Sequence, residues 1–346
     1  MNYEKVLARL CSQRAPSGFE KEISQEAAKL LRPLVDEVEV DQVGNVIGVL
    51  RCGKKNAPKL LLDAHLDEIG LIVTGHKEGF LQFSPIGGVD ARMLLDREVV
   101  ILTNPAIHGI VTCLPPHIQS AKDMETVTQV DDLFIDVGLP QEEAVKRIPN
   151  GTPIVYDADC RPLGTEMFCG KSLDDRSCFA IMLDTAEQLH NKPLDVDVYF
   201  LGSTQEEYRG LGAITATFRL HPDFCVAVDV THGDSPDAPA EKTTRIGGGP
   251  VIVTGPNCSR WMVHRMKEQA TLQKIAYQIE VIPGCTFTNG WYMQVSQEGI
   301  ATTLLSLPLR YMHSPIEVIS RSDLTNTANL LTAFVSGLGK EAADHA

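Results

Sequence analysis

The sequence lacks any C-x-x-C pair, and its nine cysteines are spread singly through 346 residues. This spacing argues against a disulfide framework and against a zinc site made of thiolates, and it indicates a reducing environment. The sequence also lacks an apolar run long enough to span a bilayer. Residues 1–5 are not followed by the apolar segment of a signal peptide, so we expect a cytoplasmic protein.

Basic residues are in deficit, because 31 lysines and arginines face 45 aspartates and glutamates, which gives a formal net charge of −14. An acidic surface repels phosphate groups, so neither nucleic acids nor anionic membranes are expected as partners. Aromatic residues make up only 6%, and the two tryptophans offer few stacking platforms for a sugar chain. Hydrophobic residues make up 43%, which is enough for a buried core and argues against disorder.

Strand-like and helical segments alternate over most of the chain, which is typical of a parallel sheet covered by helices. Short apolar runs such as residues 59–64 predict buried strands. We therefore predict an α/β fold with a mainly parallel sheet. Apolar residues recur at helical spacing in segments that include 177–190, 211–219, 260–274 and 322–338.

A different composition begins near Ile69. From there to Arg161 the chain shows short β-like runs interrupted by Gly, Pro and Asp, with almost no helical periodicity. This pattern predicts a compact β-barrel-like insertion in the α/β domain. We place the α/β domain at residues 1–68 and 162–346, and the inserted domain at residues 69–161.

Histidines and carboxylates follow the predicted strands, at the edge where open α/β sheets bind their ligands. They come from distant parts of the chain, but parallel strands bring their carboxyl ends to the same edge. One acidic pair stands just before the helix predicted from residue 177. The set is His65, Asp67, Asp174, Asp175, Glu206, Glu207, Asp229 and His313.

Two histidines with several carboxylates and no thiolates suit zinc, cobalt or manganese. A site for one metal needs about three protein ligands, and this set is larger, which indicates two ions. A carboxylate must then bridge the ions, and the pair Asp174 and Asp175 is its natural source. Glu206 and Glu207 point opposite ways if the backbone is extended, so one can bind metal while the other reaches a water molecule.

Each residue alone has a simpler interpretation. His65 and Asp67 could form a surface pair, although Asp67 could also accept the free imidazole N–H of a metal-binding His65. Paired glutamates are common at solvated helix starts, and Asp174 could be a helix N-cap. Asp229 and His313 could be ordinary turn and loop residues. Their joint placement at successive strand ends favours a site.

Several short stretches also match the motifs of a known family, in the family's order and over nearly the whole chain. They are Ala15-Pro16-Ser17-Gly18-Phe19-Glu20, Asp41 with Gly44-Asn45, Ala64-His65-Leu66-Asp67-Glu68-Ile69-Gly70, Leu173-Asp174-Asp175-Arg176, Gln205-Glu206-Glu207 with Gly210, Asp229-Val230-Thr231-His232, and Arg310-Tyr311-Met312-His313-Ser314-Pro315. On these motifs the sequence resembles the tetrahedral (TET) or glutamyl-aminopeptidase-like family of two-metal aminopeptidases.

The resemblance implies two divalent ions in each subunit, zinc or cobalt, and a role for each residue. It implies that Asp174 bridges both ions and that Glu206 is the general base. It also implies that Asp67 orients one of the histidine ligands. The remaining implied ligands are His65 and Asp229 for one ion, and Glu207 and His313 for the other.

The resemblance further implies a cytoplasmic enzyme that removes N-terminal residues from short peptides. The inserted β-barrel would be a dimerisation domain, and the dimers would assemble into dodecamers. Where the family usually has Gly-Thr-Asp-Ala, this chain has Thr288-Asn289-Gly290 preceded by Phe287 and followed by Trp291. If this loop faces the substrate, Asn289 and Trp291 are expected to change amine recognition or side-chain preference. His117 is expected in a loop near a neighbouring subunit.

Other functions remain open at this point. A two-metal deacetylase or carboxypeptidase could use the same ligand set. A metal-free endoglucanase could use paired carboxylates, and a non-catalytic protein could simply bind peptides or metal. The residues alone indicate a two-metal hydrolase, and the choice of an aminopeptidase rests on the resemblance.

Overall fold

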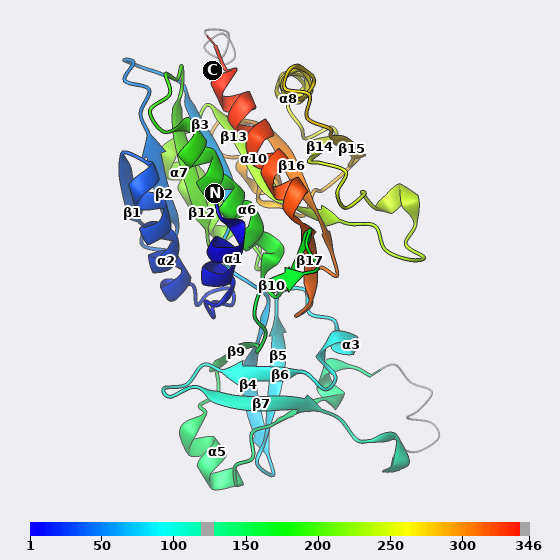
Figure 1. Ribbon diagram of the computed structural model, residues 1–346. Coiled ribbons are helices and arrows are strands. Elements are labelled where there is room, and N and C mark those ends of the chain that lie inside the picture. The colour runs from blue at the N-terminus through cyan, green and yellow to red at the C-terminus, as the bar shows by residue number, and fades with distance from the viewer. Residues whose placement is uncertain (119–127, 340–346) are drawn as a thin grey trace.

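A large sheet and a closed barrel organise the computed structural model, which describes residues 1–118 and 128–339 (Figure 1). The sheet has the strand order β1–β2–β12–β3–β13–β16–β17–β11–β10, and β14 and β15 extend from β16. Strands β12, β3, β13 and β16 are parallel neighbours. The strands are β1 (Glu37–Val40), β2 (Val46–Leu50), β3 (Lys59–His65), β10 (Arg161–Leu163), β11 (Met167–Gly170), β12 (Asp197–Ser203), β13 (Phe224–His232), β14 (Val251–Thr254), β15 (Gln278–Val281), β16 (Ala301–Arg310) and β17 (Glu317–Ser320).

The central strands are buried on both faces, as their continuous apolar runs predict. In β3, Leu60 and Leu62 belong to the larger core cluster on one face of the sheet, whereas Leu61 belongs to a smaller cluster on the other face. This split follows from the alternation of side chains along a strand. Strand β3 therefore lies between two helical layers, and its last residue, His65, is carried to the edge of the sheet.

Helices cover both faces of the sheet (Figure 1). Helix α6 packs on β3 and β13, with α10 beside it, and α7 lies on β12 at the opposite face together with α9. The helices of this part are α1 (Tyr3–Cys11), α2 (Lys21–Leu31), α6 (Leu173–Leu189), α7 (Leu211–Leu220), α8 (Arg260–Leu272), α9 (Asn289–Met293) and α10 (Arg321–Ser336), with short 3₁₀ turns η1 (Arg32–Leu34) and η4 (Ala240–Lys242).

The barrel forms below the sheet and has a core of its own (Figure 1). Its strands close in the order β4–β5–β8–β7–β6–β9, and all its pairs are antiparallel. Inward-facing Val73, Leu81 and Ile135 are among the buried residues of that core. The elements are β4 (Gly70–Lys77), β5 (Phe80–Ile86), α3 (Ala91–Leu94), β6 (Glu98–Ile101), β7 (Ile107–Thr112), η2 (Pro116–Ile118), η3 (Val130–Asp132), β8 (Phe134–Asp136), α5 (Gln141–Arg147) and β9 (Pro153–Tyr156).

The predicted fold class is confirmed: a mainly parallel α/β sheet covered by helices is accompanied by a closed β-barrel. Two details differ from the sequence expectations. Strand β13 does not end before Asp229 but continues to His232, and the barrel segment contains the short helices α3 and α5. Within the described ranges, no helix combines the length and the apolar character needed to cross a membrane.

Candidate metal centre

Neighbouring strands of the sheet deliver the predicted site residues to one edge. Ser203 at the end of β12 pairs with His65 at the end of β3, so the two strands finish level with each other. Glu206 and Glu207 follow β12 directly, and Asp229 lies in β13, the neighbour of β3 on its other side. The carboxyl ends of parallel strands thus bring these residues together.

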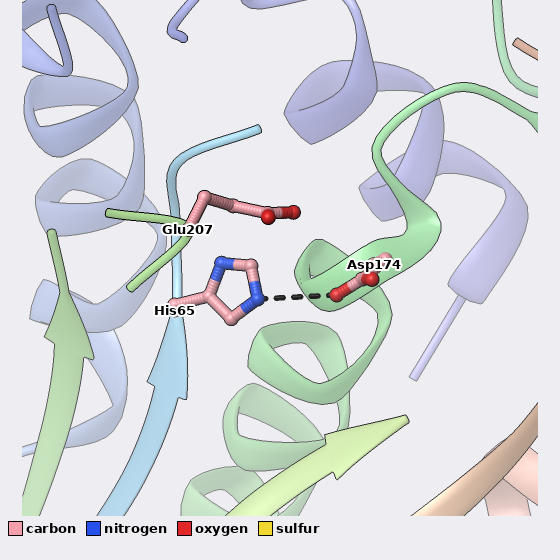
Figure 2. Close-up of side chains that lie close together, drawn as sticks. All are labelled: His65, Asp174 and Glu207. Atoms are coloured by element: carbon pink, nitrogen blue, oxygen red, sulfur yellow. Dashed lines mark hydrogen bonds and ion pairs between the residues drawn. The ribbon is translucent and has the colours of Figure 1, made fainter. Parts of the chain in front are cut away.

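The carboxylate of Asp174 lies between two imidazole rings. Its Oδ1 atom is 3.1 Å from Nε2 of His65, and its Oδ2 atom is 3.4 Å from Nε2 of His313. Nε2 of His313 is also 3.3 Å from Oε1 of Glu207. Figure 2 shows the carboxylates of Asp174 and Glu207 approaching the ring of His65 from two sides. One carboxylate therefore faces a different histidine with each oxygen.

A second group forms around the same histidine. His65, Asp175 and Asp229 each offer a donor atom within 4.8 Å of the others. Oδ2 of Asp175 accepts a hydrogen bond from the backbone N–H of His65 at 3.3 Å, while its Oδ1 atom is buried without a hydrogen-bond partner among the residues that the structure describes. The sequence analysis considered Asp175 together with Asp174 as the source of a bridging carboxylate, and the structure places it near His65 and Asp229.

The donor spacing fits divalent ions. Two ligand atoms bound to one tetrahedral zinc at 2.0–2.1 Å lie roughly 3.3 Å apart. Nε2 of His65 and Oδ1 of Asp174 are 3.1 Å apart, and Nε2 of His313 is 3.3 Å from Glu207 and 3.4 Å from Asp174. The nitrogen and oxygen donors also suit a borderline ion such as zinc or cobalt.

The many carboxylates of the centre also favour bound dications. Burial, together with the charge of Asp174 and Asp63, raises the pKa of Asp229 to about 8. Burial is also the main cause of the raised pKa values of Glu206 and Glu207, and neighbouring carboxylates add to it. So many buried carboxylates are unfavourable as anions unless cations lie among them. The residues present therefore fit a centre that holds dications.

The pKa values of the two histidines are also raised, but by their carboxylate neighbours and against the effect of burial. Burial alone would lower the pKa of His313, but its contacts with Asp174 and Glu207 outweigh burial and raise the pKa to about 12. The pKa of His65 is raised well above its ordinary value for the same reason, through Asp174 and Asp67. In the protein alone, protons on these rings thus supply part of the positive charge that metal ions would supply.

Asp67 connects His65 to the loop that carries the two glutamates. Its Oδ1 atom accepts the backbone N–H of Glu206 and its Oδ2 atom accepts that of Glu207, both at 3.1 Å. Nδ1 of His65 lies 3.1 Å from the backbone carbonyl oxygen of Asp67 and 3.5 Å from Oδ1. Asp67 can therefore orient the ring and hold the glutamate loop at the same time.

Glu317 has a comparable position that the sequence analysis missed. It is buried at the start of β17, where its two oxygens accept the backbone N–H groups of Asp174 at 3.1 Å and His313 at 3.0 Å. Burial raises its pKa well above the ordinary value. Its only sequence signal was a glutamate beginning an apolar run shortly after His313, and such a pattern is common outside sites.

The other family motifs meet behind the centre. Oε1 of Glu20 accepts the backbone N–H of Gln205 at 3.1 Å, and Oδ1 of Asn45 accepts that of Thr204 at 3.1 Å. Both contacts hold the start of the glutamate loop. Motifs that lie far apart in the sequence therefore converge on one segment.

A buried ion cluster supports the Asp174 side. Nζ of Lys171 is 2.7 Å from Oε2 of Glu68, and Nη2 of Arg176 is 3.2 Å from Oε1 of the same carboxylate. All three side chains are buried. The cluster ties the segment after His65 to the segment on both sides of Asp174.

The loop that departs from the family pattern does not present Asn289 to a substrate. Asn289 is buried, and its Nδ2 atom donates to Oδ2 of Asp63 at 2.8 Å and to Oγ of Ser203 at 2.9 Å. The expected change in amine recognition through Asn289 therefore has no direct route, because the residue lies beneath the site. Phe287, in contrast, is exposed and lines the pocket.

An open pocket of about 820 Å³ lies over the centre. His65, Asp174, Glu206, Glu207, Asp229 and His313 all line it. Asp67 lies beneath them, with no exposed surface. His117 is remote from this pocket, since it lies exposed in η2 of the barrel.

Known proteins share both the sequence and the architecture. The family model described as M42 glutamyl aminopeptidase matches residues 44–330. The lysyl aminopeptidase of Pyrococcus furiosus is 33% identical over 340 residues, covering 96% of this chain and 97% of its own length. Most of this chain therefore has a counterpart in a curated aminopeptidase.

Solved structures extend the likeness. The aminopeptidase APDkam598 of Desulfurococcus kamchatkensis has a TM-score of 0.91 at 34% identity and covers 98% of this chain and 96% of that one. The TET1 peptidase of Pyrococcus horikoshii, which can assemble into a tetrahedron or a large octahedral shell, has a TM-score of 0.85 at 28% identity, with 97% and 100% covered.

Proposed function

From the membership of this chain in the M42 glutamyl aminopeptidase family, which makes it a peptide hydrolase, we infer that it is a metal-dependent aminopeptidase that removes N-terminal residues from short peptides. One observation carries the proposal of two ions in each subunit. The two oxygens of Asp174 face different histidines, at 3.1 and 3.4 Å. A carboxylate in this position is suited to bridge two dications.

The proposed ligand set divides between two ions. His65 and Asp229 would hold one ion, with Asp175 close enough to contribute. Glu207 and His313 would hold the other. Zinc or cobalt suits these nitrogen and oxygen donors, and Asp174 would be shared.

Glu206 is the proposed general base. When bound, such ions polarise a scissile carbonyl and lower the pKa of a water molecule. Glu206 lines the pocket, 3.9 Å from Nε2 of His65, and burial raises its pKa above the ordinary value, which is the direction that favours a general base. Glu206 would take the proton of the attacking water and return it to the leaving amine.

The structure of the chain supports further proposals about its assembly and setting. We place the catalytic domain at residues 1–68 and 162–346 and assign dimerisation to the barrel domain at 69–161. Dimers would join into a dodecamer, because a tetrahedron like the one that the TET1 peptidase can form has twelve equivalent positions. All nine cysteines are free thiols, which agrees with a cytoplasmic setting.

The decisive experiment compares free and N-terminally blocked forms of the same short peptides. We expect cleavage of the free peptides only, complete loss of activity with a strong chelator, and recovery with zinc or cobalt. Preferential release of the acyl group from the blocked peptide would indicate a deacetylase, and release of the C-terminal residue would indicate a carboxypeptidase. Unchanged activity after chelation would refute the metal dependence.

The Glu206→Gln variant tests the base. We expect its turnover to fall by about 10²- to 10⁴-fold, because a positioned general base contributes that much. Its metal content, measured by elemental analysis, should stay at the wild-type value. Full turnover by this variant would remove Glu206 from the base role.

The family does not determine which N-terminal residue is preferred. Its description names glutamyl substrates, whereas the curated relative is a lysyl enzyme. The choice must therefore lie in the pocket of this chain.

A further inference from the structure

One wall of the pocket carries a carboxylate that the proposed metal centre does not use. Glu280 lies in β15 and reaches over to β13, where its Oε2 atom accepts a hydrogen bond from Oγ1 of Thr231 at 2.9 Å. Both residues line the pocket, and Glu280 is half-buried. This contact holds the carboxylate against the pocket wall.

Thr231, which holds Glu280, lies close to a proposed metal ligand along β13. Thr231 follows the proposed ligand Asp229 by two residues in β13, so both side chains lie on the same side of the strand. Two residues along a strand correspond to roughly 6.6 Å. Glu280 belongs to neither group of possible metal ligands among the described residues, but it lines the pocket over them.

No basic side chain among the described residues forms an ion pair with Glu280. Lys242 and Arg209 also line the pocket, but both are exposed, and neither forms an ion pair with Glu280 within residues 1–118 and 128–339. The inner wall thus presents a negative charge that no cation of this part of the chain neutralises. A ligand with a positive charge would be complementary to it.

Apolar groups lie in the same pocket. Leu304 of β16 and Ile282, which follows β15, both line it, and Leu304 is buried. A substrate side chain that contacts these residues and ends at Glu280 would need an aliphatic stem and a cationic head. Lysine and arginine have this character, because their long methylene stems can be buried while the head stays polar.

We propose that Glu280, held by Thr231, is the residue that selects the side chain of the N-terminal residue, and that the enzyme prefers peptides beginning with lysine or arginine. This inference rests on the proposed aminopeptidase function. The distance also separates this role from capture of the α-amine. The amine is two bonds from the scissile carbonyl carbon and must stay near the metal centre, whereas Glu280 is held at Thr231, two residues further along β13 than the proposed ligand Asp229.

The test uses the metal-loaded enzyme with lysyl, arginyl, leucyl and glutamyl arylamides, and compares kcat/KM among wild type, Glu280→Gln and Glu280→Arg. We expect wild type to prefer the lysyl and arginyl substrates. A charge-assisted hydrogen bond is worth roughly 10- to 100-fold, so Glu280→Gln should lower the lysyl-to-leucyl ratio by about that factor. Its leucyl activity should fall much less than its lysyl activity, and a metal content at the wild-type value reports correct folding. Glu280→Arg should raise activity on the glutamyl substrate.

Glu241→Gln is the matched control, because Glu241 is a second carboxylate of the pocket lining but is exposed on η4. This variant should keep the wild-type ratio. A wild type that prefers leucyl over lysyl substrates would overturn the proposal, and so would a Glu280→Gln variant with an unchanged ratio. An equal loss on every substrate would assign Glu280 to the α-amine instead. If wild type cleaves no arylamide or peptide at all, the aminopeptidase function itself fails.

Discussion

The two halves of the candidate metal centre differ in how they are held. The inner half, His65, Asp175 and Asp229, lies deep, and the side chain of His65 is only 2% exposed. The outer half, Glu207 and His313, lies towards the barrel; the side chain of His313 is 31% exposed, whereas that of Glu207 is 6% exposed. Two of the three inner residues belong to strands of one sheet, whereas both outer residues belong to loops.

The loops of the outer half depend on contacts from other elements. Glu317 fixes the backbone of His313, and Nδ1 of His313 lies 2.8 Å from the carbonyl oxygen of Gly88, which follows β5 of the barrel. The inserted segment is thus part of the support of the outer half. If the centre holds the two proposed ions, the sheet should retain the inner ion firmly, while the outer ion should respond to changes in the loops.

The largest effect is expected from Asp174→Ala, because Asp174 belongs to both halves. This variant should lose both ions, and activity should fall on the order of 10³-fold or more, as for removal of an essential catalytic group. Elemental analysis of the purified variant measures the loss of metal. Asp159→Ala, which removes an exposed carboxylate, should keep the wild-type metal content. Retention of both ions by Asp174→Ala would contradict the bridging role.

The two halves of the centre can be compared directly by replacing one proposed ligand of each half in turn. Asp229→Asn should weaken only the inner ion and His313→Ala only the outer ion, so each variant should retain about one ion per chain. During dialysis against a chelator, the ion left in His313→Ala should leave more slowly than the ion left in Asp229→Asn. Equal rates would show that the difference in burial has no bearing on retention.

A smaller effect is expected from Gly88→Ala, which tests the barrel contact. A Cβ atom at Gly88 would lie 2.7 Å from Nδ1 of His313, so the ring must move. Loss of such a supporting contact typically weakens metal binding by about 10- to 100-fold. We expect this loss for the outer ion alone, measured by titration of the metal-free protein. Gly284→Ala is the control, since a Cβ atom there meets no atom within 4 Å.

The smallest effect on the centre is expected at Glu20, which holds the start of the loop that carries Glu206 and Glu207. Burial, with the charge of Asp67, raises the pKa of Glu20 from 4.5 to about 7. Since the folded protein holds this proton more tightly than the unfolded chain, Glu20 lowers the stability as the pH rises through this window. Glu20→Gln should therefore gain roughly 2–3 kcal/mol relative to wild type between pH 5 and pH 8.

Urea unfolding of both proteins at the two pH values measures this gain. Glu22→Gln, which changes an exposed carboxylate in the first turn of α2, the helix that Glu20 precedes, should show no such dependence. A difference between Glu20→Gln and wild type that does not vary with pH would show that Glu20 has no raised pKa.

Much of the architecture was predictable because it follows from local patterns. Helical periodicity over 211–219 and 260–274 corresponds closely to α7 and α8, and the apolar run at 59–64 became β3. Prediction of the site used one further rule, that parallel strands end at a common edge. That rule is enough to bring His65, the glutamate pair and Asp229 together.

The sequence by itself determined the fold class and the strand-end residues, since both depend on short-range periodicity and on the geometry of parallel strands. Only the tertiary structure decided what surrounds them. The contacts of Glu317 with His313, of Gly88 with the same ring, and of Glu280 with Thr231 join segments with no common period. Loops come into contact because whole helices and strands pack together, and the spacing of residues along the chain does not predict those contacts.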